Sequence, residues 1–311
     1  MDIVVVMDGP DTVAPETDTS FALIVAAQAR GHRVWHCAAN AVEYGDDRIW
    51  ARARPAVADA DATPPLVLAP HQRIDLGSVD AVLVRTDPPF DATYLHLTLL
   101  LDHLVGTTLV VNAPRGLRDA NEKLYACKFP DITPPTIVSA DDKRIVAFAR
   151  EHGAAVLKPI AGHGGRGVMA LRPDDNNAPS IIDTLTDRGR VPVVAQRFLP
   201  NVAAGDKRIL LLDAEPLGAI LRIPTASDFR ANICVGGSTV ATEIDAADRR
   251  IIERIAPSLR ADGLVFVGLD VVDGQLTEVN VTSPTGICQL GALTGDTPAF
   301  DVITWLERHA T

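Results

Sequence analysis

Two carboxylates and one amide lie close together in a short stretch near the end of this chain. The segment 268–280 contains two apolar runs joined by Asp273-Gly274, a dipeptide typical of tight hairpin turns. Alternation along a strand places Glu278 and Asn280 on one face, and the hairpin brings Asp270 beside them. Hard oxygen ligands of this kind suit Mg²⁺, which usually takes further ligands from water and substrate phosphates. The alternative is a hairpin with an ordinary solvated face.

A glycine-rich loop is the second candidate for chemistry. Residues 162–167 read Gly-His-Gly-Gly-Arg-Gly and include Gly164 and Gly165. Glycines let backbone N–H groups approach an anion, so such a loop can hold phosphates, although a glycine-rich hairpin tip is as often only a turn. It is not a Walker A loop, because no Gly-Lys-Ser/Thr follows. Lys158 upstream and Lys123 in a predicted helix are either partners for an anion or solvated surface lysines.

Composition excludes several classes of protein. The 311 residues include 40 acidic and 29 basic side chains, and the net charge of −11 argues against a nucleic-acid or anionic-membrane partner. No apolar run approaches the ~20 residues of a membrane-spanning helix. The first residues have no basic leader, and the four scattered cysteines form no CxxC pair, so we expect free thiols and a cytoplasmic protein.

The first part of the chain predicts an α/β unit. A strand over Ile3–Met7, a helix over Ser20–Arg30 and a strand over Arg33–Cys37 indicate a βαβ opening with parallel strands. The first turn lacks GxGxxG, which disfavours a nicotinamide or flavin enzyme. We expect an irregular hairpin region over 38–77, and then strands and a helix up to about residue 115.

The rest of the chain alternates differently and fits a smaller α+β arrangement. A hairpin tipped by the glycines is placed to close over a ligand. Helices are predicted over 116–129, 141–152, 180–188 and 246–261, and strands over 154–159, 168–171, 192–198, 206–212 and 215–222.

The order of these pieces resembles the ATP-grasp superfamily and, more narrowly, bacterial glutathione synthetase. The resemblance runs almost end to end. It is carried by Arg85-Thr-Asp-Pro-Pro-Phe-Asp91, Leu117-Arg-Asp-Ala-Asn-Glu-Lys-Leu124, Leu157-Lys-Pro159, Gly205-Asp-Lys-Arg208, Gly263-Leu-Val-Phe-Val-Gly-Leu-Asp270 and Thr277-Glu-Val-Asn-Val-Thr-Ser-Pro-Thr285.

The resemblance implies an α/β fold in two parts. A parallel-sheet domain over 1–120, on the substrate side, precedes a two-lobed α+β ATP-grasp domain over 121–311. In that second domain a lid subdomain spans about 121–199 and a C-terminal sheet about 200–311.

The same resemblance implies an ATP- and magnesium-dependent ligase, with Mn²⁺ as a possible substitute. It joins γ-glutamylcysteine and glycine through an acyl phosphate, and the protein is a homotetramer. The implied ATP-binding residues are Lys123, Lys158, Gly164, Gly165, Gln196, Arg197, Phe198, Leu199 and Asp206. The implied metal ligands are Asp270, Glu278 and Asn280, and the implied catalytic residues are Arg208, Arg222, Arg230 and Asn232. The acid substrate is expected to contact Arg85, Asp87, Ser283 and Thr285.

Each arginine has a plain alternative. Arg208 and Arg222 suit the transferring phosphoryl group and the tetrahedral intermediate, but either can instead form a structural ion pair. Arg85 ends a predicted strand and either pairs with a substrate carboxylate or binds a local aspartate.

The chain departs from the family pattern in two places. Where the family has Gly-Gly-Glu and, soon after, another glycine, this chain has Ala226-Ser227-Asp228 and Ala231, and Gln289 replaces a glutamate. Loss of glycine stiffens a loop that is expected to close over the site. We therefore expect the amine preference to be the feature most open to change. The alternatives are an ATP-grasp ligase of another γ-glutamyl-type acid or amine, and a non-catalytic nucleotide-binding protein, which the retained carboxylates disfavour.

Overall fold

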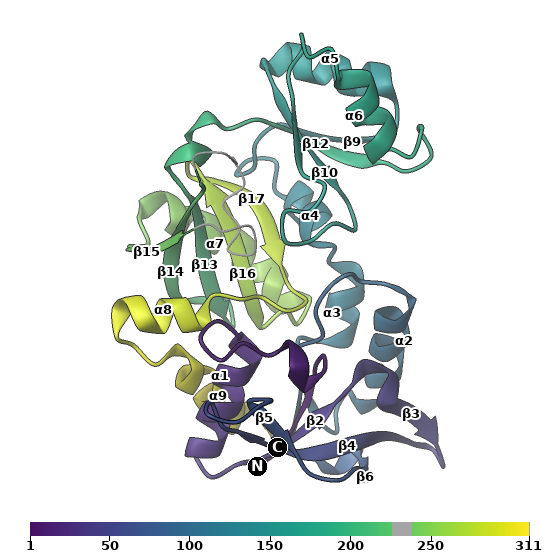
Figure 1. Ribbon diagram of the computed structural model, residues 1–311, viewed down its shortest axis with the longest axis vertical. Coiled ribbons are helices and arrows are strands. Elements are labelled where there is room, and N and C mark those ends of the chain that lie inside the picture. The colour runs from purple at the N-terminus through teal and green to yellow at the C-terminus, as the bar shows by residue number, and fades with distance from the viewer. Residues whose placement is uncertain (226–237, 311) are drawn as a thin grey trace.

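Three β-sheets with flanking helices make up the protein (Figure 1). The computed structural model describes residues 1–225 and 238–310. Its mixed α/β architecture, with a sheet that contains four parallel strands (β2, β1, β7 and β8) followed by two antiparallel sheets, confirms the predicted fold class. Within the described part of the chain, no helix has the length and apolar character needed to cross a membrane.

The first sheet has the order β3-β4-β2-β1-β7-β8, with β5 and β6 also paired to β4. The predicted βαβ opening is confirmed, because β1 pairs in parallel with both β2 and β7. The strands are β1 (Asp2–Val6), β2 (Arg33–Cys37), β3 (Val42–Gly45), β4 (Arg48–Ala58), β5 (Leu66–Leu68), β6 (Gln72–Asp75), β7 (Ala81–Val84) and β8 (Leu109–Val111). The helices of this region are α1 (Thr19–Ala29), α2 (Ala92–Leu101) and α3 (Pro114–Asp119).

Residues 38–77 are more regular than the sequence indicated. Strand β4 runs for 11 residues and pairs antiparallel with four other strands. Ile49, Ala51 and Ala53 alternate into the core along it, and this period of two favours a strand despite the Ala/Pro-rich composition.

The second sheet, with the order β11-β10-β12-β9, forms a lobe of its own at the top of Figure 1. Its strands are β9 (Thr136–Ser139), β10 (Ala155–Pro159), β11 (Met169–Leu171) and β12 (Val193–Arg197), and its helices are α5 (Asp142–His152) and α6 (Ala178–Leu185). Apolar residues of α5, α6 and this sheet form their own hydrophobic cluster, separate from the two cores of the rest of the protein. We call this lobe the lid.

The third sheet has the order β15-β14-β13-β16-β17. Its strands are β13 (Asp206–Leu212), β14 (Glu215–Ile223), β15 (Ser238–Thr242), β16 (Phe266–Val272) and β17 (Gln275–Asn280), and the helices that follow in this part of the chain are α7 (Ala246–Ala261), α8 (Ile287–Thr294) and α9 (Pro298–His309). The predicted hairpin is confirmed. Asp273 and Gly274 both have positive φ, 52° and 64°, as a two-residue type I′ turn requires, and Asp270 pairs with Glu278.

The single helix predicted over 116–129 is wrong. Helix α3 ends at Asp119, and a new helix, α4 (Glu122–Tyr125), begins after Asn121 and is followed by a 3₁₀ turn. The side-chain oxygen of Asn121 accepts hydrogen bonds from the backbone N–H of Lys123 and Leu124, each at 3.1 Å. Asparagine is better suited to this capping role than to a helix interior, so it restarts the helix in a new direction.

The first and third sheets share two continuous cores. Val4 and Val6 of β1 join the core that includes α2, α3 and α7, whereas Ile3 and Val5 join the core that includes α1, α8 and α9. Both cores continue into the third sheet, so these two sheets form one body, which we call the base.

Asn112 joins the two sheets of the base. It is 4% exposed, and its amide nitrogen donates to the carbonyl oxygens of Phe266 at 2.9 Å and Val281 at 2.8 Å. Its amide oxygen accepts from the backbone N–H of Val265 and Phe266, both at 2.7 Å. All four partners are backbone groups, and all lie in or beside β16 and β17.

Replacing this amide is expected to destabilise the whole base. Asn112→Ala leaves four buried backbone groups without their partner, and we expect the free energy of unfolding to fall by about 3 kcal/mol or more. Urea unfolding measures this value, with the exposed Asn176→Ala as the matched control. A loss below about 1 kcal/mol would show that water or rearrangement satisfies these groups.

Candidate active site

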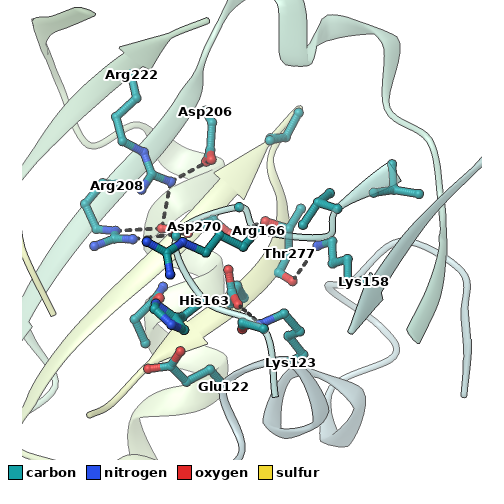
Figure 2. Close-up of a pocket in the computed structure, with 18 of the residues that line it drawn as sticks. Glu122, Lys123, Lys158, His163, Arg166, Asp206, Arg208, Arg222, Asp270 and Thr277 are labelled. Carbon is teal, nitrogen blue, oxygen red and sulfur yellow. Dashed lines mark hydrogen bonds and ion pairs between the residues drawn. The ribbon is translucent and has the colours of Figure 1, made fainter. Parts of the chain in front are cut away.

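A cavity of about 350 Å³ lies between the lid and the third sheet (Figure 2). This volume is typical of small-molecule sites. Nearly all of the described candidate residues from the sequence line it: Asp87, Lys123, Lys158, Gly164, Gly165, Gln196, Arg197, Phe198, Leu199, Asp206, Arg208, Arg222, Asp270, Glu278, Asn280, Ser283 and Thr285. Arg85 does not line it, and Arg230 and Asn232 lie outside the described residues.

Asp270 lies at the centre of a buried ionic network on the third sheet. Its carboxylate accepts from Arg208 Nε at 2.6 Å and Nη2 at 3.2 Å, and it lies 2.9 Å from Arg222 Nη2. Figure 2 shows both guanidinium groups directed at this carboxylate. Burial opposes ionisation, but the two arginines outweigh burial and hold the pKa of Asp270 well below its ordinary value.

Strand register explains the convergence of these side chains. Arg208 lies opposite Asp270 across β13 and β16, and Asp206 lies opposite Arg222 across β13 and β14. Gly268 leaves room for the Arg208 side chain, since a Cβ there would lie only 3.1 Å from Arg208 Cδ. Both arginines form ion pairs within the protein, and both also line the cavity.

Asp206 is held by Arg222, whose Nη2 lies 2.6 Å from one carboxylate oxygen. The other oxygen is buried and has no hydrogen-bond partner among the described residues. Burial raises the pKa of Asp206 to about 6, although the nearby Arg222 opposes this shift. The unpartnered oxygen can accept a hydrogen bond from a ligand hydroxyl.

Two lysines approach the cavity from the lid side (Figure 2). Lys123 of α4 is 6% exposed, lies 2.9 Å from the Glu278 carboxylate, and donates to the carbonyl oxygen of Gly162 in the glycine loop. Lys158 of β10 donates to Gln196 Oε1 at 2.9 Å and to the carbonyl oxygen of Thr277 at 3.4 Å.

Lys158 has no ion pair with a carboxylate among the residues that the structure describes. Burial lowers its pKa, with Glu278 and other carboxylates opposing that shift. A partly buried cation with only neutral hydrogen-bond acceptors is energetically costly, and its position suits an incoming anion.

The oxygen donors on β16 and β17 fit a magnesium ion. Asp270 and Glu278 lie opposite each other, and Asn280 lies opposite Gly268 on the same face. Asn280 Nδ2 donates to the Gly268 carbonyl at 3.2 Å, which leaves its amide oxygen available to a cation. No group of three His, Cys, Asp or Glu suited to a metal is found among the described residues, since the third donor here is an amide. Two carboxylates and an amide match an ion that completes its shell with water and phosphate oxygens.

Arg85 lies directly behind the wall of the cavity. Its guanidinium is buried, and it donates to Ser20 Oγ and to the carbonyl oxygen of Pro284, both at 3.1 Å. Its Nη1 has no hydrogen-bond partner among the described residues, and burial lowers its pKa. Asp87 and Ser283 line the cavity beside it, and burial raises the pKa of Asp87.

Three titratable residues that line the cavity were not singled out from the sequence: Glu122, His163 and Arg166. His163 and Arg166 belong to the glycine loop, where only the glycines were considered. Glu122 precedes Lys123, and its position became visible only with the break of the predicted helix at Asn121.

Two family models match the chain over most of its length. The N-terminal domain of prokaryotic glutathione synthetase matches residues 1–118, and the ATP-grasp domain of prokaryotic glutathione synthetase matches residues 122–295. The chain belongs to the prokaryotic glutathione synthetase family.

Curated relatives agree with this assignment. Glutathione synthetase of Thermosynechococcus vestitus is 44% identical, with 98% of this chain and 99% of the relative covered. Glutathione synthetase of Nostoc sp. is 43% identical, with 99% and 98% covered. Among solved structures, D-cycloserine synthetase DcsG is similar in fold, with a TM-score of 0.65 and 16% identity over 99% of both chains. As a member of this family, the chain is an ATP-dependent carbon–nitrogen ligase of the ATP-grasp class.

Lys158 is expected to affect nucleotide binding more than stability. Lys158→Met keeps most of the side-chain volume and removes a partly buried charge that has only neutral hydrogen-bond partners. We expect unchanged or slightly higher stability and about 10-fold or more weaker ATP binding. Calorimetric titration with ATP and thermal unfolding measure the two effects, with the exposed Lys143→Met as control. Lower stability together with unchanged affinity would assign Lys158 a purely structural role.

Proposed function

We propose that this enzyme joins γ-glutamylcysteine to glycine, with hydrolysis of ATP to ADP and phosphate, to form glutathione. The observation that carries this proposal is the cavity between lid and base, where Lys123, Arg208 and Arg222 pair with carboxylates of the third sheet and Lys158 also lines the wall. The family assignment and the near-complete coverage of glutathione synthetases support the same substrates.

The nucleotide would lie between the lid and the third sheet. Lys123 and Lys158 are placed to bind its phosphates as point charges, and the backbone of the loop at Gly164 and Gly165 is placed to cover them. The segment Gln196–Leu199 would contact the adenine edge through its backbone. Asp206 would accept hydrogen bonds from the ribose hydroxyls through its unpartnered oxygen.

Asp270, Glu278 and Asn280 would hold Mg²⁺, which when bound neutralises phosphate charge during phosphoryl transfer. Mn²⁺ is proposed as a substitute, since it accepts the same oxygen donors. A cation held by Glu278 would compete with the ion pair to Lys123, and Lys123 would then be available to bind a phosphate.

The substrate carboxylate attacks the γ-phosphorus and ADP leaves, which gives an acyl phosphate. The amine nitrogen then attacks the acyl carbon, phosphate leaves, and the nitrogen loses a proton. Arg208 and Arg222 are placed to stabilise negative charge in both steps, because their guanidinium groups are held rigidly against Asp270. Arg230 and Asn232, which lie outside the described residues, are proposed to close over the acyl phosphate and exclude water.

The acid substrate is proposed to lie between Asp87, Ser283 and Thr285. Arg85 would attract its carboxylate from behind the cavity wall, with the Pro284 carbonyl held in place by the same guanidinium. A buried arginine with an unpartnered nitrogen supplies a positive potential that favours an acidic ligand.

The amine site is the part in which a second candidate function has support. Gln289 replaces a family glutamate, and its side-chain oxygen is buried without a hydrogen-bond partner among the described residues. Gln289 does not line the described cavity, so we propose that the loss of charge here changes the amine preference indirectly. A ligase with another amine or γ-glutamyl-type acid is therefore the alternative.

We also propose a homotetramer in the cytoplasm, where ATP and both amino-acid substrates are available. Light scattering on the purified protein measures the oligomeric state, and a monomer at micromolar concentration would contradict the tetramer.

Mass spectrometry of the product tests the substrates. With γ-glutamylcysteine, Mg-ATP and glycine, alanine or serine at matched concentrations, we expect glutathione as the main product. A missing hydrogen-bond partner can cost ~10⁴-fold in specificity, whereas one methylene costs only ~10–200-fold, so acids without the γ-glutamyl group should be poor substrates. Faster turnover with alanine or serine would assign another amine. No turnover with any γ-glutamyl acid would exclude both the glutathione synthetase activity and a γ-glutamyl ligase with another amine.

Glu278 is expected to be essential for turnover. Glu278→Gln removes one of two anionic ligands and the partner of Lys123, so we expect the rate to fall by about 100-fold or more while the fold is kept. Steady-state phosphate release and circular dichroism measure the two quantities. The exposed Glu253→Gln serves as control, and normal turnover of Glu278→Gln would show that the hairpin is structural.

A further inference from the structure

Three consecutive residues at the start of α4 connect the lid to the base. Asn121 Nδ2 donates to the carbonyl oxygen of Ile160, and Lys123 donates to that of Gly162, so both contact the start of the glycine loop. Lys123 also pairs with Glu278 of β17. Between them, the Glu122 side chain forms hydrogen bonds with residues of the base, and Figure 2 shows it beside Lys123 at the edge of the cavity.

One carboxylate oxygen of Glu122 accepts three hydrogen bonds from two adjacent residues. The donors are Thr282 Oγ1 at 2.8 Å, the backbone N–H of Val281 at 3.3 Å and that of Thr282 at 3.4 Å. Strand β17 ends at Asn280, so these two N–H groups lie beyond the strand ladder. Glu122 therefore supplies the acceptor that a neighbouring strand would otherwise provide.

The segment held by Glu122 lies between two functional positions. Asn280 immediately precedes it, and Ser283 immediately follows it. Thr282 is 5% exposed and Val281 is fully buried, so the anchored segment is packed as well as hydrogen-bonded. A shift here would displace the end of β17, where Asn280 is the last residue of the ladder, relative to Asp270 and Glu278 further inside it.

We propose that Glu122 is a positioning residue for the magnesium–nucleotide complex. It holds the end of β17 against the start of α4. The proposed metal ligand, Asn280, and the proposed phosphate-binding cation, Lys123, therefore keep their relative positions. A neutral apolar side chain would fill the same place at lower desolvation cost, which argues that the acceptor itself is used. The inference rests on the proposed function only in that magnesium and ATP bind in this cavity.

The test is the magnesium dependence of nucleotide binding. Glu122→Met removes the acceptor with nearly the same volume, and Glu122→Gln keeps an acceptor at the same reach. Calorimetric titration with the non-hydrolysable ATP analogue AMPPNP, at several Mg²⁺ concentrations, gives the Mg²⁺ concentration for half-maximal binding. For Glu122→Met we expect this concentration to rise about 10-fold, the size of effect typical of outer-shell residues of metal sites.

Three comparisons make the result specific. Glu122→Gln should restore most of the magnesium response, and Thr282→Val, which removes the shortest hydrogen bond, should reproduce part of the defect without adding fully to Glu122→Met. The exposed Glu253→Met should behave as the unaltered protein.

Binding by Glu122→Met that equals the unaltered protein at every Mg²⁺ concentration would overturn the proposal. So would a loss of affinity and stability with no magnesium dependence, which indicates a merely structural role. If Glu122→Met and Glu122→Gln weaken the magnesium response equally, the proposal is also overturned, because the charge of Glu122 and not its hydrogen bonds would then explain the effect. No acid or amine is present in these titrations, so they remain decisive even if the proposed product is not formed.

Discussion

Charges buried in the cavity must be compensated by the protein itself, and this requirement determines the arrangement of the site. Arg208 and Arg222 share the carboxylate of Asp270, Arg222 also binds Asp206, and Lys123 pairs with Glu278. Removing one partner from such a network leaves an uncompensated charge, which is far more costly than losing an exposed ion pair. The pairing depends on the register of β13 against β14 and β16. The ionic network can therefore form only when these strands are correctly paired.

Because of this pairing, the carboxylates and cations that would bind a ligand already form ion pairs with each other. A divalent cation satisfies the carboxylates, and an anionic nucleotide satisfies the lysines and arginines, so the two ligands together preserve the charge balance that either alone would disturb. Lys158 is different, because in the described part of the chain its ammonium donates hydrogen bonds only to neutral oxygens. The site therefore contains ion pairs whose partners a ligand can replace, together with Lys158, whose charge is costly to hold without a ligand.

Local patterns in the sequence predicted much of the fold. Most of the candidate residues chosen from the sequence line one cavity in the structure. Asp273-Gly274 specifies its turn by local conformation, and period-two alternation then places Asp270 and Glu278 opposite each other. The partners of Asp270 could not be predicted in the same way, because Arg208 and Arg222 reach it only through the order of strands distant in sequence. The break at Asn121 was missed because the flanking residues favour a helix, and capping depends on the direction that the chain takes next. Arg85 was placed in the right region, but packing of Pro284 separates it from the cavity, and packing is not readable from strand ends.

The joint at Asn112 has a consequence for how this kind of protein can diverge. Its four hydrogen bonds end on backbone atoms of the third sheet, so they require a sheet edge of a given shape and no particular side chain. These four bonds therefore place no demand on the side chains of the third sheet, whereas the two shared cores do. The lid, with a core of its own, is mechanically separate from this joint. Substrate-side loops can thus be remodelled in evolution, or exchanged between homologous chains, while the base remains one rigid support.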